Sequence, residues 1–135
     1  MLFPDSAIQL PAASLQLDAE LIVRVTWTSH RYQPAEFRAV LEQVLRLLLA
    51  SGSGKVLADQ RLMMPIPPPE QEWLLHEWLP RALRDGGYRY AAVLPSHEVF
   101  ARLASTNVSM RVMTPYPVYR WFDNEGSALE WLRQQ

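Results

Sequence analysis

The sequence predicts an α/β fold, a mixed and mostly parallel sheet of four or five strands with about four helices. Segments of strand-like apolar pattern alternate along the chain with segments whose apolar residues repeat at helical spacing. The 135 residues match the commonest size of one domain, and 49% hydrophobic with 20% charged residues is ordinary for a globular protein. Because no repeat or linker divides the chain, we expect a single domain over 1–135.

The first strands are expected before residue 30. Residues 8–17 form a strand-like region interrupted by Pro11, and Glu20 to Thr28 is the strongest strand signal because it alternates with period two. Ile22 interrupts the polar face of this strand, which suggests that this face is partly covered too. The apolar face of the strand is predicted to hold Leu21, Val23, Val25 and Trp27.

A long amphipathic helix follows. Pro34 suits its first turn, since the fixed φ of proline fits there and the missing N–H costs nothing. We expect the helix to run to about Ala50 and to be ended by the glycines of 51–54. Its apolar stripe comprises Phe37, Val40, Leu41, Val44, Leu45, Leu48 and Leu49.

The middle of the chain combines a short buried strand with a stiff loop. Lys55 to Asp59 is the strand, and four of the eleven prolines lie in the loop over 61–69. A second helix is expected from Glu70 to the glycines at 86–87. Pro80 lies inside it and must either kink the helix or open a new first turn.

The last third repeats the alternation. Tyr88 to Leu94 and Val118 to Phe122 are predicted strands. Ser96 is the expected N-cap of a short helix that carries Val99, Phe100 and Leu103. Asp123 or Asn124 should cap a final helix with Ala128, Leu129 and Leu132 turned inward.

A series of short motifs resembles the SpoIIAA-like family of STAS-type domains over about residues 20–133. The resemblance implies a sheet with helices packed on it, a fold shared with anti-anti-sigma factors and reminiscent of CRAL-TRIO lipid-binding domains, and relatives that act as regulatory or ligand-sensing modules. The motifs are Trp27, Leu57-Ala58-Asp59-Gln60-Arg61, Glu77-Trp78-Leu79-Pro80-Arg81-Ala82, Gly87-Tyr88-Arg89, Ala92-Val93-Leu94-Pro95, Val99-Phe100-Ala101-Arg102-Leu103, Phe122-Asp123 and Ala128-Leu129-Glu130-Trp131-Leu132. Residues 59–70 contain no serine or threonine, so the phosphorylation switch of anti-anti-sigma factors is not carried over.

Composition argues against several classes of function. The net charge of −1 and the absence of a basic tract argue against nucleic-acid binding. The chain has no cysteine, and its apolar runs are far shorter than the ~20 residues of a membrane span. The three histidines lack zinc-motif spacing, and His76 is expected to form a surface ion pair with Glu72. We therefore expect a cytoplasmic protein with no cofactor, no metal and no membrane span.

No catalytic constellation is apparent. Ser96, His97 and Glu98 are the residue types of a hydrolase triad, but consecutive residues on a helix do not face one another. Asp59 and Arg61 follow a strand at the carboxyl-terminal edge of the predicted sheet, where open α/β sheets bind ligands. The alternative for this pair is a salt bridge or loop hydrogen bonds.

Two hypotheses remain from the sequence. The first is a non-enzymatic regulatory or protein-interaction module, which binds a partner through the loop and the neighbouring strand ends and whose surface aromatics would suit a homodimer. The second is a binder of a small apolar or lipid-like ligand, which needs a pocket of hundreds of cubic ångströms. The methionines of the loop would form an adaptable surface or pack onto the domain as a lid. The candidate binding residues are Asp59, Arg61, Met63, Met64, Ile66, Ser96 and His97.

Overall fold

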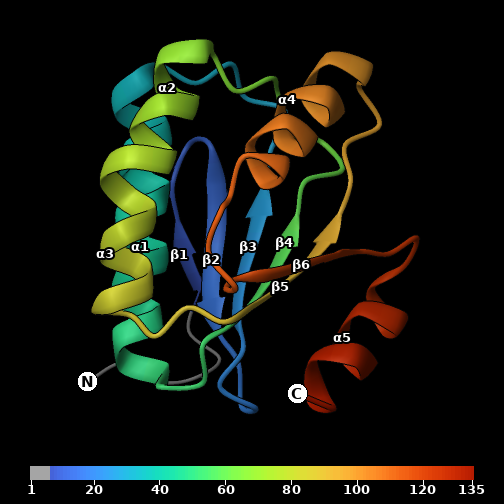
Figure 1. Ribbon diagram of the computed structural model, residues 1–135. Coiled ribbons are helices and arrows are strands. Elements are labelled where there is room, and N and C mark those ends of the chain that lie inside the picture. The colour runs from blue at the N-terminus through green and yellow to red at the C-terminus, as the bar shows by residue number, and fades with distance from the viewer. Residues whose placement is uncertain (1–6) are drawn as a thin grey trace.

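The computed structural model, which describes residues 7–135, contains a six-stranded mixed sheet with helices on both faces (Figure 1). The α/β class is confirmed, but the sheet has six strands where four or five were predicted. The strands follow one another across the sheet in chain order: β1 (Ala7–Gln9), β2 (Ala13–Leu17), β3 (Val23–Trp27), β4 (Lys55–Asp59), β5 (Tyr90–Leu94) and β6 (Val118–Trp121).

The additional strand comes from residues 8–17, which fold into a hairpin. Pro11 lacks the N–H that a continuous strand would need, and the backbone turns there, with the Leu10 N–H donating to the Ala13 carbonyl. β1, β2 and β3 are antiparallel neighbours, whereas β3 to β6 are parallel. The sheet is therefore mixed, as predicted.

The helices lie where right-handed crossovers place them. Each parallel connection steps in the same direction across the sheet, so the helices that join β3 to β6 share one face. The last helix follows β6 and packs on the other face, against β5 and β4 (Figure 1). The helical elements are α1 (Pro34–Ser51), α2 (Pro68–Trp73), η1 (Leu74–Trp78), α3 (Leu79–Arg84), α4 (Val99–Met110) and α5 (Glu125–Arg133).

The helix around Pro80 continues through a π-helical turn. α2, η1 and α3 follow one another without a break, and the Leu79 N–H donates to the Leu74 carbonyl, five residues earlier. Proline at position 80 cannot donate and would clash with the preceding turn of a regular α-helix, and the wider π turn accommodates it. Of the two alternatives predicted, the structure is closer to a new first turn after η1.

Two hydrophobic cores occupy the two faces of the sheet. The larger one lies between the sheet and α1, η1 and α3, and its aromatic centre is Phe37, whose ring stacks on that of Trp27. The smaller one lies under α5 and includes Ile22, Leu57 and Leu132. Ile22 is thus the residue that marks the covered part of the second face, as its position in the strand pattern indicated.

Three sequence predictions are wrong in detail. Leu21 is exposed and has a positive φ of 62°, because it belongs to the turn before β3. Leu49 is exposed, and Leu47 takes its place in the buried stripe of α1. Ser96 does not cap α4. The N-cap is Glu98, whose side chain accepts from the Ala101 N–H at 2.6 Å.

The close approach of two turns makes Gly54 sensitive to substitution. Its φ is +71°, and an added Cβ would lie 2.3 Å from the Gly87 carbonyl oxygen. We expect Gly54→Ala to lower the free energy of unfolding by about 3 kcal/mol or more, through backbone strain and overpacking together. Gly52 has a similar φ of +67° but open space around it, so Gly52→Ala should cost roughly 1–2 kcal/mol. Urea denaturation of both variants measures this difference, and equal losses would contradict it.

Candidate functional site

A pocket of about 90 Å³, partly open to solvent, lies in the larger core between the sheet and α1, η1 and α4. Val25, Ala58 and Val93 of three adjacent strands contribute to its wall, and the loop between β4 and α2 contributes Met63 and Ile66. Most of this wall is aliphatic or aromatic. The arrangement is that of a small-molecule pocket, which is typically apolar with a few placed polar groups.

Two polar atoms in this cavity have no hydrogen-bond partner within residues 7–135. They are Oε1 of Gln60 and Oγ of Ser105, and both are shielded from solvent. Gln60 follows the end of β4, and Ser105 lies in the middle of α4. A buried polar group without a partner costs about 1–3 kcal/mol, so native proteins contain few of them. Two such atoms on the wall of one cavity mark it as a site for a molecule that can form hydrogen bonds.

Neither residue was a sequence candidate, although a signal existed for Ser105. Ala101, Ser105 and Val108 recur at helical spacing on the inward side of α4, and the serine is the one polar member of that series. For Gln60, only its position in the sequence pointed to a possible role, since it lies between a buried strand and the proline-rich loop. The apolar residues first noticed in this helix, Val99, Phe100 and Leu103, are exposed.

Tyr88, which is buried, and Tyr119, which is partly buried, also line the cavity. The phenol groups of Tyr88 and Tyr119 are close enough to affect each other's ionisation. Burial raises the pKa of Tyr119 from 10.0 to about 12, and burial raises the pKa of Tyr88 as well. Both side chains therefore stay neutral at physiological pH and add no charge to the cavity.

These tyrosines predict a loss of stability in alkali. An unfolded tyrosine releases its proton near pH 10, whereas folded Tyr119 holds its proton up to about pH 12. The stabilisation is complete below pH 10 and decreases as the pH rises from 10 to 12, since only the unfolded chain then ionises. We expect Tyr119→Phe to flatten the decline of the free energy of unfolding in this window. Denaturant titrations from pH 9 to 12 measure it, and an unchanged slope would contradict the assignment.

The predicted strand-end residues form a compact ion pair. Asp59 Oδ1 accepts from the backbone N–H and Nε of Arg61, and Asp59 Oδ2 accepts from Arg61 Nη2 at 2.7 Å. Burial raises the pKa of Asp59, but the hydrogen bonds and charge of Arg61 outweigh this effect, so the pKa is lowered. The structure thus shows the salt bridge and loop hydrogen bonds that were the alternative to a ligand site.

A second pocket of about 90 Å³ lies at this edge, and its wall includes Asp59 together with Arg24, Thr26 and Glu125. The order of the strands shows that this pocket is not a crevice at a switch point of the sheet. In open α/β sheets the ligand crevice forms where neighbouring connections leave in opposite directions. Here β3 to β6 follow in sequence and every parallel connection steps the same way, so the described sheet has no such switch point.

The methionine-containing loop packs onto the domain. Met63 is 2% exposed and Ile66 is 5% exposed, so of the two alternatives for this loop their burial favours the lid over the adaptable surface. Met64 is half-buried. The Tyr32 hydroxyl donates to the Met64 and Pro65 carbonyls and thereby fixes the backbone of the loop. The loop therefore packs onto the domain as a lid, and its residues Met63 and Ile66 form part of the wall of the cavity.

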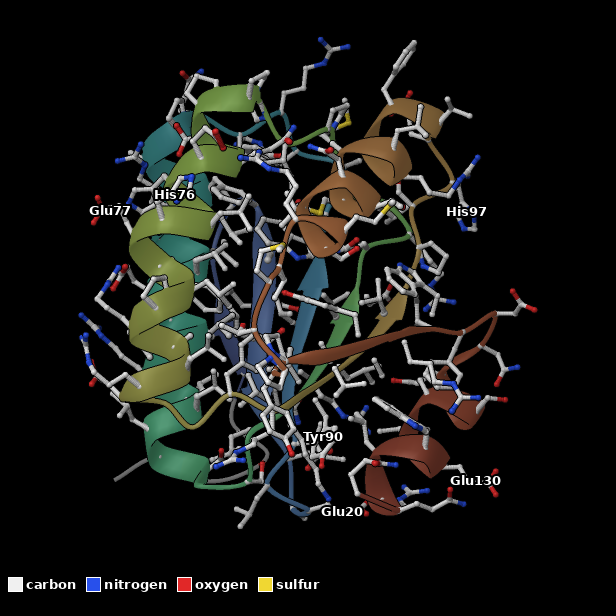
Figure 2. The ribbon with its side chains drawn as sticks, in the orientation of Figure 1. Glu20, His76, Glu77, Tyr90, His97 and Glu130 are labelled. Atoms are coloured by element: carbon white, nitrogen blue, oxygen red, sulfur yellow. The ribbon has the colours of Figure 1, made fainter. Side chains whose placement is uncertain are left out.

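The remaining candidates are Ser96 and His97. Ser96 is buried, and its hydroxyl donates to the Met63 carbonyl at 3.1 Å, which ties β5 to the loop. His97 is exposed at the periphery of the molecule, with its backbone N–H donating to the Arg61 carbonyl (Figure 2). The structure therefore brings His97 close to Asp59 and Arg61 and directs Ser96 into the loop.

His76 lies on the opposite side of the molecule from His97 (Figure 2). Its Nε2 is 4.0 Å from Glu72 Oε2, on the surface as predicted, while the closer partner of that carboxylate oxygen is Arg111 Nη2 at 2.8 Å. Within residues 7–135, no group of three or more His, Asp or Glu side chains is arranged to hold a metal ion.

The fold and the cavity together define the protein as an α/β domain with a mostly apolar pocket. No family model matches the chain, and no curated protein or solved structure matches it either. No helix in the described part of the chain combines the length and apolar character needed to cross a bilayer.

Proposed function

We propose that this protein is a non-enzymatic regulatory module that binds a small, mostly apolar molecule in the cavity. The observation that carries the proposal is the pair of buried, unpartnered atoms, Gln60 Oε1 and Ser105 Oγ, on an otherwise apolar wall. A core that served stability alone would be filled and would have its polar groups satisfied. The resemblance to SpoIIAA-like STAS-type domains supports the regulatory part of the proposal.

The size of the cavity limits the ligand. An engineered cavity of about 150 Å³ binds benzene, and pockets for drug-sized ligands measure about 300–1,000 Å³. The volume of about 90 Å³ therefore suits a molecule of about one ring, with a small movement of the wall. α4 is the wall best able to move, because only Ala101 and Val108 among its residues are buried.

The arrangement of the polar side chains supports a function other than catalysis. The Ser96 hydroxyl is engaged with the Met63 carbonyl, and the Asp59 carboxylate is engaged with Arg61. A nucleophile needs a base within hydrogen-bond reach and a third group that orients the base. Ser105, the hydroxyl in the cavity, has Gln60, Ser109 and tyrosines as its polar neighbours on the wall, and none of these is an effective base at neutral pH.

A cavity-filling substitution tests the proposal. Ser105→Leu removes an unpaired hydroxyl and fills the cavity from a helix that tolerates leucine, while Thr106→Leu is the matched control one residue further along α4. Toluene at about ten times its dissociation constant should raise the melting temperature of the natural protein and of the control by roughly 5 °C. Ser105→Leu should show no shift. Equal shifts in all three proteins, or none in any, would contradict the proposal.

A second function, self-association, is favoured by the outer face of α4. Phe100 is 69% exposed and Leu103 is 61% exposed, and Val99 and Leu62 are exposed as well. Contiguous exposed apolar side chains are typical of interaction surfaces. We propose a second copy of this chain as the occupant, because two such faces are equally apolar and an isologous dimer pairs like with like.

The oligomeric state tests the second function. Phe100→Asp should convert a dimer into a monomer in sedimentation velocity experiments, and its melting temperature should stay within a few degrees of the natural value because the side chain is exposed. Leu49→Asp, on the outer face of α1, is the matched control. A natural protein that is monomeric at high concentration would contradict self-association and leave the cavity proposal intact.

A further inference from the structure

The wall of the cavity also specifies the chemistry of the ligand. This inference rests on the proposed function. The lining residues include no Asp, Glu, Lys, Arg or His, and their polar side-chain groups are amide, hydroxyl and indole N–H groups. An ion moved into such surroundings would lose its hydration without gaining a counter-charge, at a high cost in free energy. The ligand is therefore neutral.

The polar atoms on the wall require a hydrogen-bond donor. Gln60 Oε1 is a carbonyl oxygen, which accepts and never donates, so only a donor on the ligand can satisfy it. Ser105 Oγ can both donate and accept by rotation of its hydroxyl hydrogen. A ligand hydroxyl matches these atoms, since it donates one hydrogen and accepts another. An aliphatic or aromatic hydrocarbon would leave Gln60 Oε1 unsatisfied.

Gln60 is anchored through its backbone at the end of β4. Its N–H donates to the Leu94 carbonyl at 2.9 Å, and its carbonyl accepts from the Met63 N–H at 3.0 Å. The Asp59–Arg61 ion pair flanks it on both sides in sequence. These contacts fix the backbone from which the side chain projects, so that binding a ligand needs to order the side chain alone.

The apolar part of the wall is rich in rings. Trp27, Phe37, Trp78 and Tyr88 all contribute to it, and aromatic side chains pack favourably on the face or edge of another ring. We propose that the cavity binds a neutral one-ring alcohol or phenol, whose hydroxyl donates to Gln60 Oε1 and whose ring contacts the aromatic wall.

A comparison of phenol with toluene tests this chemistry, because the two molecules have nearly the same shape and differ in the donor. Their affinities for the natural protein, for Gln60→Leu and for the control Gln43→Leu on α1 can be measured by NMR titration. The ratio of phenol affinity to toluene affinity should fall at least tenfold in Gln60→Leu and stay unchanged in Gln43→Leu. Benzoate should not bind any of the three proteins.

The outcomes separate this inference from the proposed function. If toluene and phenol bind the natural protein and their ratio does not change in Gln60→Leu, the donor assignment is overturned while the cavity proposal stands. If benzoate binds as tightly as phenol, the requirement for neutrality is overturned. If none of the molecules binds the natural protein, the proposed function itself fails.

Discussion

Met63→Asp is expected to cause the largest loss of stability of any substitution considered, a loss comparable to the whole net stability of a marginal domain. Met63 is 2% exposed and packs in the larger core, so the variant would place a carboxylate among apolar side chains with no cation to pair with. The lost packing and the buried charge together should cost about 4 kcal/mol or more, against the 5–15 kcal/mol of net stability typical of a domain. Urea denaturation followed by tryptophan fluorescence measures the loss.

The neighbouring residue provides the control for this prediction. Met64 is half-buried, and the contacts of this residue with Tyr32 involve its backbone carbonyl, which the substitution leaves in place. Met64→Asp should therefore cost no more than about 1 kcal/mol, as is usual for partly exposed positions. If Met63→Asp were as mild as Met64→Asp, the loop would not be packed as the structure shows.

Leu132→Ala is expected to have the second-largest effect, through the core under α5. Leu132 is 0% exposed and packs with Ile22, Leu57 and Leu94 in a core with few other members. Removing a buried leucine side chain costs about 2–5 kcal/mol, since the transfer free energy is lost and a void remains. A small core has fewer neighbours to close the void, so we expect a value in the upper half of this range.

The same substitution at an exposed leucine separates packing from helix propensity. Leu49 lies near the end of α1 and is 56% exposed, so Leu49→Ala should change the free energy of unfolding by less than about 0.5 kcal/mol. Differential scanning calorimetry of the two variants should show a clear decrease in melting temperature for Leu132→Ala alone. Similar decreases would indicate that α5 is not docked on the sheet.

Much of the fold could be predicted because short local sequence patterns determine where these strands and helices begin and end. The strand Lys55–Asp59 is found at the predicted residues, and α1 begins at the predicted Pro34 and ends one residue beyond the predicted end. Both rely on information within a few residues: a short apolar run in one case, and a proline start with a glycine stop in the other. The extra strand was missed because one proline can mark either a broken strand or a hairpin turn.

The cavity could not be predicted, because it depends on distances between elements. Whether Ser105 meets a partner depends on how far α4 stands from the sheet, and local sequence does not determine that distance. The same holds for Met63, for which a surface position and a buried position were both consistent with the loop composition. Asp59 was correctly placed at the end of a strand, but its engagement by Arg61 follows from a turn conformation that the residue types alone leave open.

The sequential strand order has a consequence for how the chain can fold. Every strand pairs only with its neighbours in sequence, so the strand to which each new strand must pair always precedes it in the chain. Pairing between consecutive strands keeps each loop closure as short as the intervening helix allows. The sheet can therefore grow from its first hairpin outwards during synthesis, with α5 added last to seal the far side.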